Sequence, residues 1–189
     1  MTIYNPIHKL GVAVLRIGVG IIFLWAGLEK LLGSGPKGFS AAGFLSHATS
    51  GTLGWPFVTG TPAEGTIFNP THAFWVNLSQ NAAAMQLVNF LVVAGEIGIG
   101  IALILGLFTR FAAVMGTLMM ILFFFAAWQF ETGIVNQHLT YALVCAALAG
   151  LGAGRYYGLD ALLADRVGPT VRKYILSGDP VHSTVPAAA

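Results

Sequence analysis

Four ionisable residues stand in or beside long apolar stretches of this sequence: Arg16, Lys30, Glu96 and His138. A carboxylate in hydrocarbon costs about 2.5–3.5 kcal/mol on insertion scales, so Glu96 needs a compensating partner. Histidine titrates near neutral pH, and a histidine and a buried carboxylate suit a reaction that takes up protons. We therefore name Glu96 and His138 as candidate catalytic residues, with a purely structural role as the alternative for each.

Two cations are candidates for compensating Glu96. A helix rises 1.5 Å per residue, which places Arg16 about 9 Å, Glu96 about 18 Å and Lys30 about 30 Å from one membrane boundary. Side chains lean toward the N-terminus of their helix, so Arg16 and Glu96 lean apart, whereas Lys30 leans toward Glu96 from farther away. We expect Arg16 to be the partner, with Lys30 or a bridging polar group as the alternatives.

The composition is that of an integral membrane protein. Of the 189 residues, 56% are hydrophobic and 8% are charged, whereas a soluble domain has about 25% charged residues. The net charge of +2 is too small to indicate a nucleic-acid partner. Cys145 is the single cysteine, and the histidines lack the spacing of metal ligands, so we predict neither a disulfide nor a metal site.

The hydrophobic pattern predicts an all-α protein with a bundle of four transmembrane helices. Each span needs about 20 predominantly apolar residues. We place the helices at 10–32, 84–108, 111–130 and 138–155, with a tight turn at Thr109 and Arg110. Residues 33–83 form a long loop that keeps many aromatic residues, and we expect short interfacial helices in it at 40–47 and 71–83.

Glycines share a face with the charged residues of the first predicted helix. At 100° per residue, Arg16, Gly20, Phe23, Gly27 and Lys30 follow one stripe. Small residues permit close approach of neighbouring helices in a membrane. The pattern predicts that this stripe faces other helices.

Basic residues near the predicted helix ends indicate the orientation. One side collects Lys9, Arg110, Arg155, Arg166, Arg172 and Lys173, and the other collects Lys30 and Lys37. Because basic residues concentrate on the cytoplasmic side, we expect a plasma-membrane protein with both termini in the cytoplasm and an extracytoplasmic loop 33–83. Residues 1–163 form the membrane domain, and 164–189 form a basic cytoplasmic tail. The stretch 159–175 is amphipathic and basic, and we expect it to lie on the membrane surface.

Four stretches resemble one family of membrane proteins. LRIGVGIIFLWAGLEKL at 15–31, GEIGIGIALILGLFTRFAA at 95–113 and GAGRYYGLDALL at 152–163 resemble segments of the DoxX/DoxD family. GFSAAGFL at 38–45 is similar to the DoxD branch, the large subunit of thiosulfate:quinone oxidoreductase. The order and spacing of these short stretches carry the resemblance over most of 10–163.

The resemblance implies electron transfer from thiosulfate to a membrane quinone, with tetrathionate as product. It also implies a small partner subunit on the outer side. As an expectation, the chain is then a subunit of a thiosulfate dehydrogenase that uses quinone. Arg16, Lys30, Glu96 and His138 are the candidate residues for binding the quinone, which is the expected cofactor.

Two other classes of protein remain open from the sequence. The first is a non-catalytic anchor or accessory subunit of a larger respiratory membrane complex. The second is a small-solute transporter, although no inverted repeat or pair of broken helices supports it. In each case membrane lipid surrounds the chain.

Overall fold

The computed structural model describes residues 6–33, 38–48, 69–127 and 135–177. Several expectations fall outside these residues. They concern Lys37, the aromatic residues Trp55, Phe57 and Phe68 of the long loop, the last three residues of the predicted span 111–130, and the tail beyond Ser177.

Helices make up the regular structure of the described residues, which contain no strand. Three helices are long and apolar enough to cross a membrane, and they belong to α1 (Pro6–Gly33), α4 (Ala82–Leu105) and α5 (Thr109–Ala127). A fourth apolar helix, α6 (Gln137–Leu151), has 15 residues and is shorter than a usual span. The all-α prediction is thus confirmed for the described residues, together with three of the predicted membrane helices.

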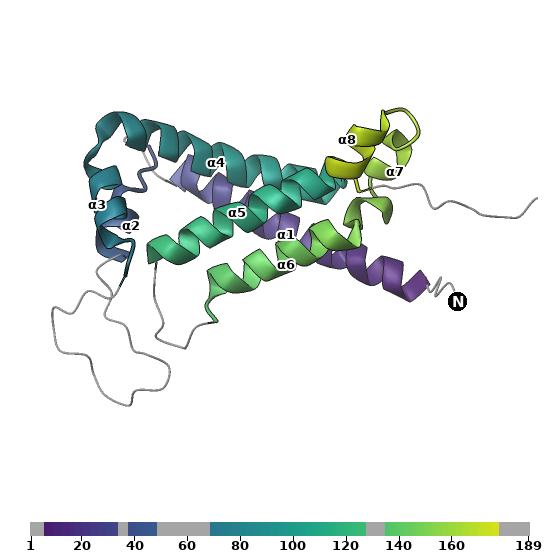
Figure 1. The fold of residues 1–189 in the computed structure, drawn as a ribbon, viewed down its shortest axis with the longest axis horizontal. Coiled ribbons are helices and arrows are strands. Elements are labelled where there is room, and N and C mark those ends of the chain that lie inside the picture. Colours follow the sequence, from purple (N-terminus) through teal and green to yellow (C-terminus); the bar gives the residue numbers. More distant parts are fainter. Residues whose placement is uncertain (1–5, 34–37, 49–68, 128–134, 178–189) are drawn as a thin grey trace, which may run out of the picture.

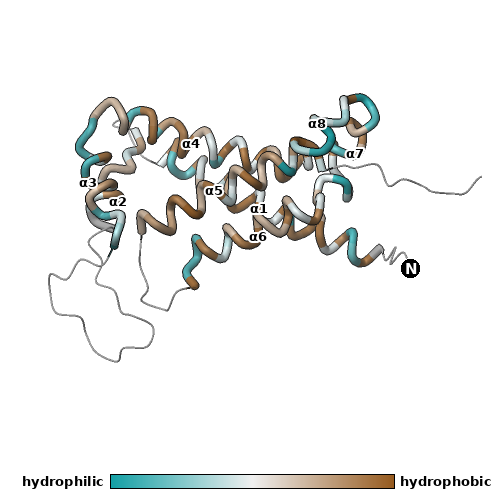
Figure 2. Tube along the Cα trace, viewed as in Figure 1, coloured by the Kyte–Doolittle hydropathy of each residue, from teal (hydrophilic) through white to brown (hydrophobic). Residues whose placement is uncertain are grey.

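The four helices run alongside one another, as Figure 1 shows. Helix α1 packs mainly against α4, and α5 packs mainly against α6. The common core contains Val19 and Phe23 of α1, Ile99 and Leu103 of α4, and Cys145 of α6. Figure 2 shows apolar residues along the length of these helices and more polar residues toward the two ends of the bundle.

Glycines bring the backbones of α1 and α4 together, as the sequence predicts. A Cβ atom added to Gly100 would lie 2.5 Å from the backbone nitrogen of Leu24. One added to Gly27 would lie 2.7 Å from the side chain of Ile97. Any larger residue at Gly100 would therefore push the two helices apart.

The turn between α4 and α5 begins earlier than predicted. Gly106 ends α4 in the left-handed conformation with φ of 66°, and Phe108 has φ of 50°. Thr109 and Arg110 already belong to α5, so the tight turn expected at these two residues is wrong by about three positions. Gly106 fits its position because glycine adopts positive φ without steric cost.

Two short helices, α2 (Ala42–Ala48) and α3 (His72–Gln80), form a cap over one end of the bundle. Ala41, Leu45 and Trp75 pack against Met85 of α4 and Ala126 of α5. The side-chain oxygen of Asn89 in α4 accepts a 2.9 Å hydrogen bond from the backbone nitrogen of Ala41. We call this end of the bundle the Lys30 end.

The chain after α6 folds back on the opposite end, which we call the Arg16 end. It contains a 3₁₀ turn (Ala153–Arg155), α7 (Asp160–Leu163) and α8 (Pro169–Tyr174). Leu176 and Ser177 are fully buried. The stretch 159–175 contains two short helices separated by a turn that ends at Gly168, and Asp160 is buried in the protein. The expectation that this stretch lies on the membrane surface stays a prediction.

Candidate functional site

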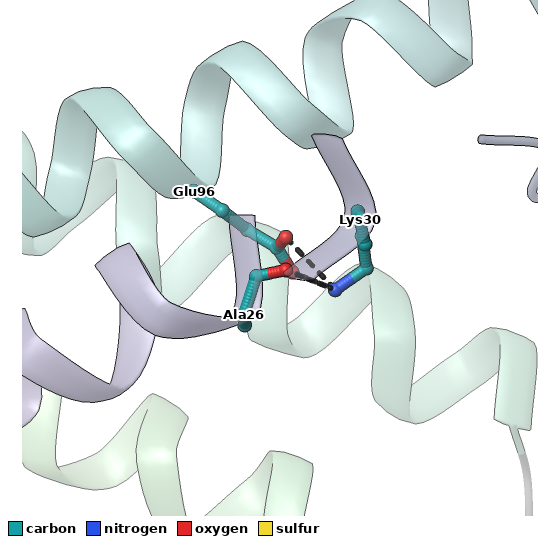
Figure 3. Close-up of polar contacts among 3 residues, drawn as sticks. All are labelled: Ala26, Lys30 and Glu96. Carbon is teal, nitrogen blue, oxygen red and sulfur yellow. Dashed lines mark hydrogen bonds and ion pairs between the residues drawn. The ribbon is translucent and has the colours of Figure 1, made fainter. Parts of the chain in front are cut away.

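Lys30 of α1 and Glu96 of α4 form a partly buried ion pair between the two helices (Figure 3). The Nζ atom of Lys30 lies 2.9 Å from both carboxylate oxygens and donates a hydrogen bond to Oε1. The same ammonium lies 3.4 Å from the carbonyl oxygen of Ala26, one turn back along α1. The lysine thus leans toward the N-terminus of its helix, as expected for a helical side chain.

The partner of Glu96 is therefore Lys30, and the first expectation of an Arg16–Glu96 pair is wrong. The two cations are fourteen residues apart on α1, or about 21 Å along the helix axis. A depth estimate from helix rise alone favours Arg16, but it does not include the reach of a lysine side chain toward the helix N-terminus. The alternative with Lys30 is the one that the structure contains.

Glu96 retains one oxygen that no hydrogen bond uses. The residue is 2% exposed, and its Oε2 accepts no hydrogen bond from the described residues, although it lies in the ion pair. The side chain of Lys30 is 26% exposed. Buried polar atoms normally have a hydrogen-bond partner, so an unused acceptor beside a partly accessible ammonium marks a place for a ligand or a proton.

One aromatic ring lies over the ammonium of this ion pair, and a second ring contacts His138. The ring of Phe39 lies 5.9 Å from Nζ of Lys30. His138, at the start of α6, is close enough to Lys30 for the two to interact electrostatically. The rings of His138 and Phe123 meet edge to face, with their centroids 5.8 Å apart. We call Lys30, Phe39, Glu96, Phe123 and His138 the Lys30 cluster.

Of the four predicted site residues, Lys30, Glu96 and His138 thus belong to one region. Arg16 lies elsewhere. Arg16 is fully buried at the other end of the bundle. Its Nη1 donates to the carbonyl oxygen of Ala153 at 3.0 Å, and its Nη2 donates to that of Tyr157 at 3.2 Å. The carboxylate of Asp160 is close enough to interact with it electrostatically.

Asp160 ties the C-terminal segment to the turn between α4 and α5. Its Oδ1 accepts a 2.7 Å hydrogen bond from the backbone nitrogen of Phe108. Its Oδ2 accepts hydrogen bonds from the backbone nitrogens of Thr109, at 3.0 Å, and Ser177, at 3.2 Å. We call Arg16, Thr109, Asp160 and Ser177 the Arg16 cluster.

Asp160 is not among the residues predicted from the sequence, because its stretch was expected on the membrane surface. The sequence signal is the run of glycines before it, Gly152, Gly154 and Gly158, which have no room for a side chain in the structure. A Cβ added to Gly158 would lie 2.5 Å from Nη1 of Arg16. Two other atoms of the Arg16 cluster, Nε of Arg16 and Oγ1 of Thr109, are buried without a hydrogen-bond partner among the described residues.

Within the described residues, neither Cys145 nor a cluster of potential metal ligands forms a further candidate site. Cys145 is fully buried in the common core, and a Cβ on Gly116 of α5 would lie 3.2 Å from its Sγ. Within the described part of the chain, no three His, Cys, Asp or Glu residues gather as metal ligands would. The prediction of no metal site concerns the whole chain and stays a prediction.

The long apolar helices and the buried charges between them define an integral membrane protein. The sequence model of the DoxX family matches residues 11–129, which is nearly two thirds of the chain, and the protein therefore belongs to the DoxX family. The matched segment includes Arg16, Lys30 and Glu96, whereas His138 and Asp160 follow it. Searches of curated proteins and of solved structures gave no match.

Proposed function

We propose that this chain is the membrane subunit of a quinone-linked oxidoreductase of the DoxD type, in which the Lys30 cluster receives the quinone headgroup. The observation that carries the proposal is the buried carboxylate of Glu96, with one oxygen that accepts no hydrogen bond, beside the partly exposed ammonium of Lys30. A quinone offers carbonyl oxygens, and its reduced form offers hydroxyl groups. The ammonium can donate to the former, and Oε2 of Glu96, which accepts no hydrogen bond from the described residues, can accept from the latter.

The reaction needs two electrons and two protons for each quinone. Oxidation of two thiosulfate ions to one tetrathionate forms one sulfur–sulfur bond and releases the two electrons. In this chain, Glu96 and His138 are the groups that hold or transfer protons, and Lys30 orients the headgroup and stabilises negative charge on it. Phe39, whose ring lies 5.9 Å from Nζ of Lys30, restricts access of water to the ion pair.

The proposal includes the topology. α6 acts as a fourth membrane crossing, continued by the turn that follows it, so that four helices form the bundle. The Arg16 end, where Arg110, Arg155, Arg172 and Lys173 gather, faces the cytoplasm of a cell whose plasma membrane holds the protein. The α2–α3 cap then faces outward, where a partner subunit delivers the electrons.

The test measures quinone binding by the full chain in lipid nanodiscs, together with thiosulfate-dependent quinone reduction in a membrane preparation that retains its partners. Glu96→Gln and His138→Ala should each lower the reduction rate about 100-fold, a typical loss for a proton-transfer group. Glu29→Gln and His8→Ala are matched controls, because both residues are exposed and lie outside the cluster. They should leave the rate unchanged.

Two results would contradict the proposal. Normal quinone content and normal reduction in both cluster variants would make these residues structural. A stable larger complex in which this chain binds no quinone would identify it as an accessory subunit.

A further inference from the structure

An apolar groove of about 830 Å³ runs between α4 and α5. The residues that line it are all apolar. Gly95 and Gly98 form part of its α4 wall, Met119 and Phe123 form part of its α5 wall, and Trp75 of the cap closes it at the Lys30 end. Helix α4 packs closely against α1. On the side of α4 that faces α5, glycine and alanine side chains are too small to fill the space, and the groove results.

The groove and the Lys30 cluster share Phe123. This ring lines the groove and also contacts the ring of His138. Phe44, another lining residue, contacts Phe123 with a centroid distance of 6.1 Å. Phe123 therefore joins the wall of the apolar groove to His138 of the Lys30 cluster.

The dimensions of the groove indicate a hydrocarbon chain as its occupant. Its α4 wall extends from Val88 to Ala102, which is about 21 Å of helix. The volume over that length gives a mean cross-section of about 40 Å², which one or two extended hydrocarbon chains can fill.

One observation favours the tail of a neutral lipid over a phospholipid acyl chain. The Lys30–Glu96 pair has no net charge, so it offers no excess positive charge to a phosphate group. A long tail attached to an uncharged headgroup matches this pair.

We infer that the α4–α5 groove holds the isoprenoid tail of the quinone, with Phe123 at the junction between tail and headgroup. The inference rests on the proposed function and adds the class of substrate, a quinone with a long tail, and the route by which it reaches the site from the lipid. Transfer of a tail from lipid into the groove gains packing but little hydrophobic free energy. The contribution to affinity is therefore modest, and the position of the tail is the more direct measurement.

The first experiment uses the full chain in nanodiscs of defined phospholipid and a benzoquinone whose isoprenoid tail carries a photoreactive group. After illumination, the cross-linked residues should lie on α4 and α5, around Gly98 and Met119. Unlabelled long-tailed quinone should compete, and excess phospholipid should not. Cross-links on the outward faces of α1 and α6, or competition by phospholipid alone, would show that only bulk lipid occupies the groove.

The second experiment fills the groove. Gly98 is exposed, and a Cβ there meets nothing within 4 Å, so Gly98→Phe adds a ring without disturbing the helix contacts. Gly18→Phe on α1 is the matched control, because Gly18 is equally open and lies outside the groove. Gly98→Phe should weaken binding of the long-tailed quinone about fivefold and leave binding of the same headgroup on a one-unit tail unchanged.

The two proposals fail in different ways. Equal affinity of wild type and Gly98→Phe for the long-tailed quinone would overturn the groove inference and leave the headgroup site intact. If wild type binds neither quinone, the proposed function fails as well.

Discussion

The two ends of the bundle bury charge in different ways. In the Arg16 cluster, Asp160 uses both carboxylate oxygens to accept backbone hydrogen bonds, and Arg16 is 0% exposed. In the Lys30 cluster, Glu96 keeps one oxygen free of hydrogen bonds, and the side chain of Lys30 is 26% exposed. A carboxylate that is fully used by the backbone holds the fold together, whereas one with an unused oxygen beside an accessible cation can receive a ligand.

The largest expected effect comes from the Arg16 end. Asp160→Asn keeps the size of the side chain but replaces the oxygen that accepts from the backbone nitrogens of Thr109 and Ser177 with an NH₂ group, which cannot accept. A buried donor left unsatisfied costs about 1–3 kcal/mol, so two of them should lower the free energy of unfolding in detergent by about 2–6 kcal/mol. Asp165→Asn is the control, since Asp165 is exposed, and it should change stability by less than about 0.5 kcal/mol. Equal stability of the two variants would show that Asp160 is not a structural anchor.

A double-mutant cycle tests the separation between the two clusters. Lys30→Met and Glu96→Gln should each destabilise, and the double variant should lose less than their sum by about 0.5–3 kcal/mol, because the residues are in contact. Asp160→Asn combined with Glu96→Gln should be additive within about 0.5 kcal/mol. Coupling between Asp160 and Glu96 would mean that the two ends act as one network. Thermal or denaturant unfolding monitored by circular dichroism supplies the free energies.

Substitutions at two glycines of α4 test how closely this helix packs against α1. In Gly100→Ala, the new Cβ meets the backbone of Leu24, so we expect a loss of about 1–3 kcal/mol from overpacking. In Gly98→Ala, on the open side of the same helix, the change should be neutral or stabilising by up to about 1 kcal/mol. The same unfolding measurement compares the two variants. Similar effects at both positions would indicate that α1 and α4 are less tightly packed than described.

The last prediction concerns one hydrogen bond of the Arg16 cluster. The hydroxyl of Ser177 accepts a 3.0 Å hydrogen bond from the backbone nitrogen of Gly154. Ser177→Ala leaves that buried donor unsatisfied and should cost about 1–3 kcal/mol, at or below the effect of Asp160→Asn. Amide hydrogen exchange at Gly154 should rise in parallel. Unchanged exchange would show that the last described residues do not secure this turn.

The sequence predicted the membrane helices and the glycine contact because both depend on local patterns. Apolar runs of sufficient length identify α1, α4 and α5, and the spacing of Gly20 and Gly27 places them on the face that meets α4. The partner of Glu96 was misassigned because it depends on side-chain reach. Asp160 was missed because its hydrogen bonds join segments that are more than fifty residues apart in the chain. The groove depends on the separation of α4 from α5, which no local pattern records.

The contacts of Arg16 have a consequence for how the protein is made. Its hydrogen-bond acceptors, Ala153 and Tyr157, follow it by 137 and 141 residues. At about 5–20 residues per second, a ribosome needs roughly 7–27 s to supply the first of them. During that interval the first helix already carries an arginine that lacks its final partners. Biogenesis of this protein therefore includes a stage in which the insertion machinery, lipid headgroups or water must accommodate that charge.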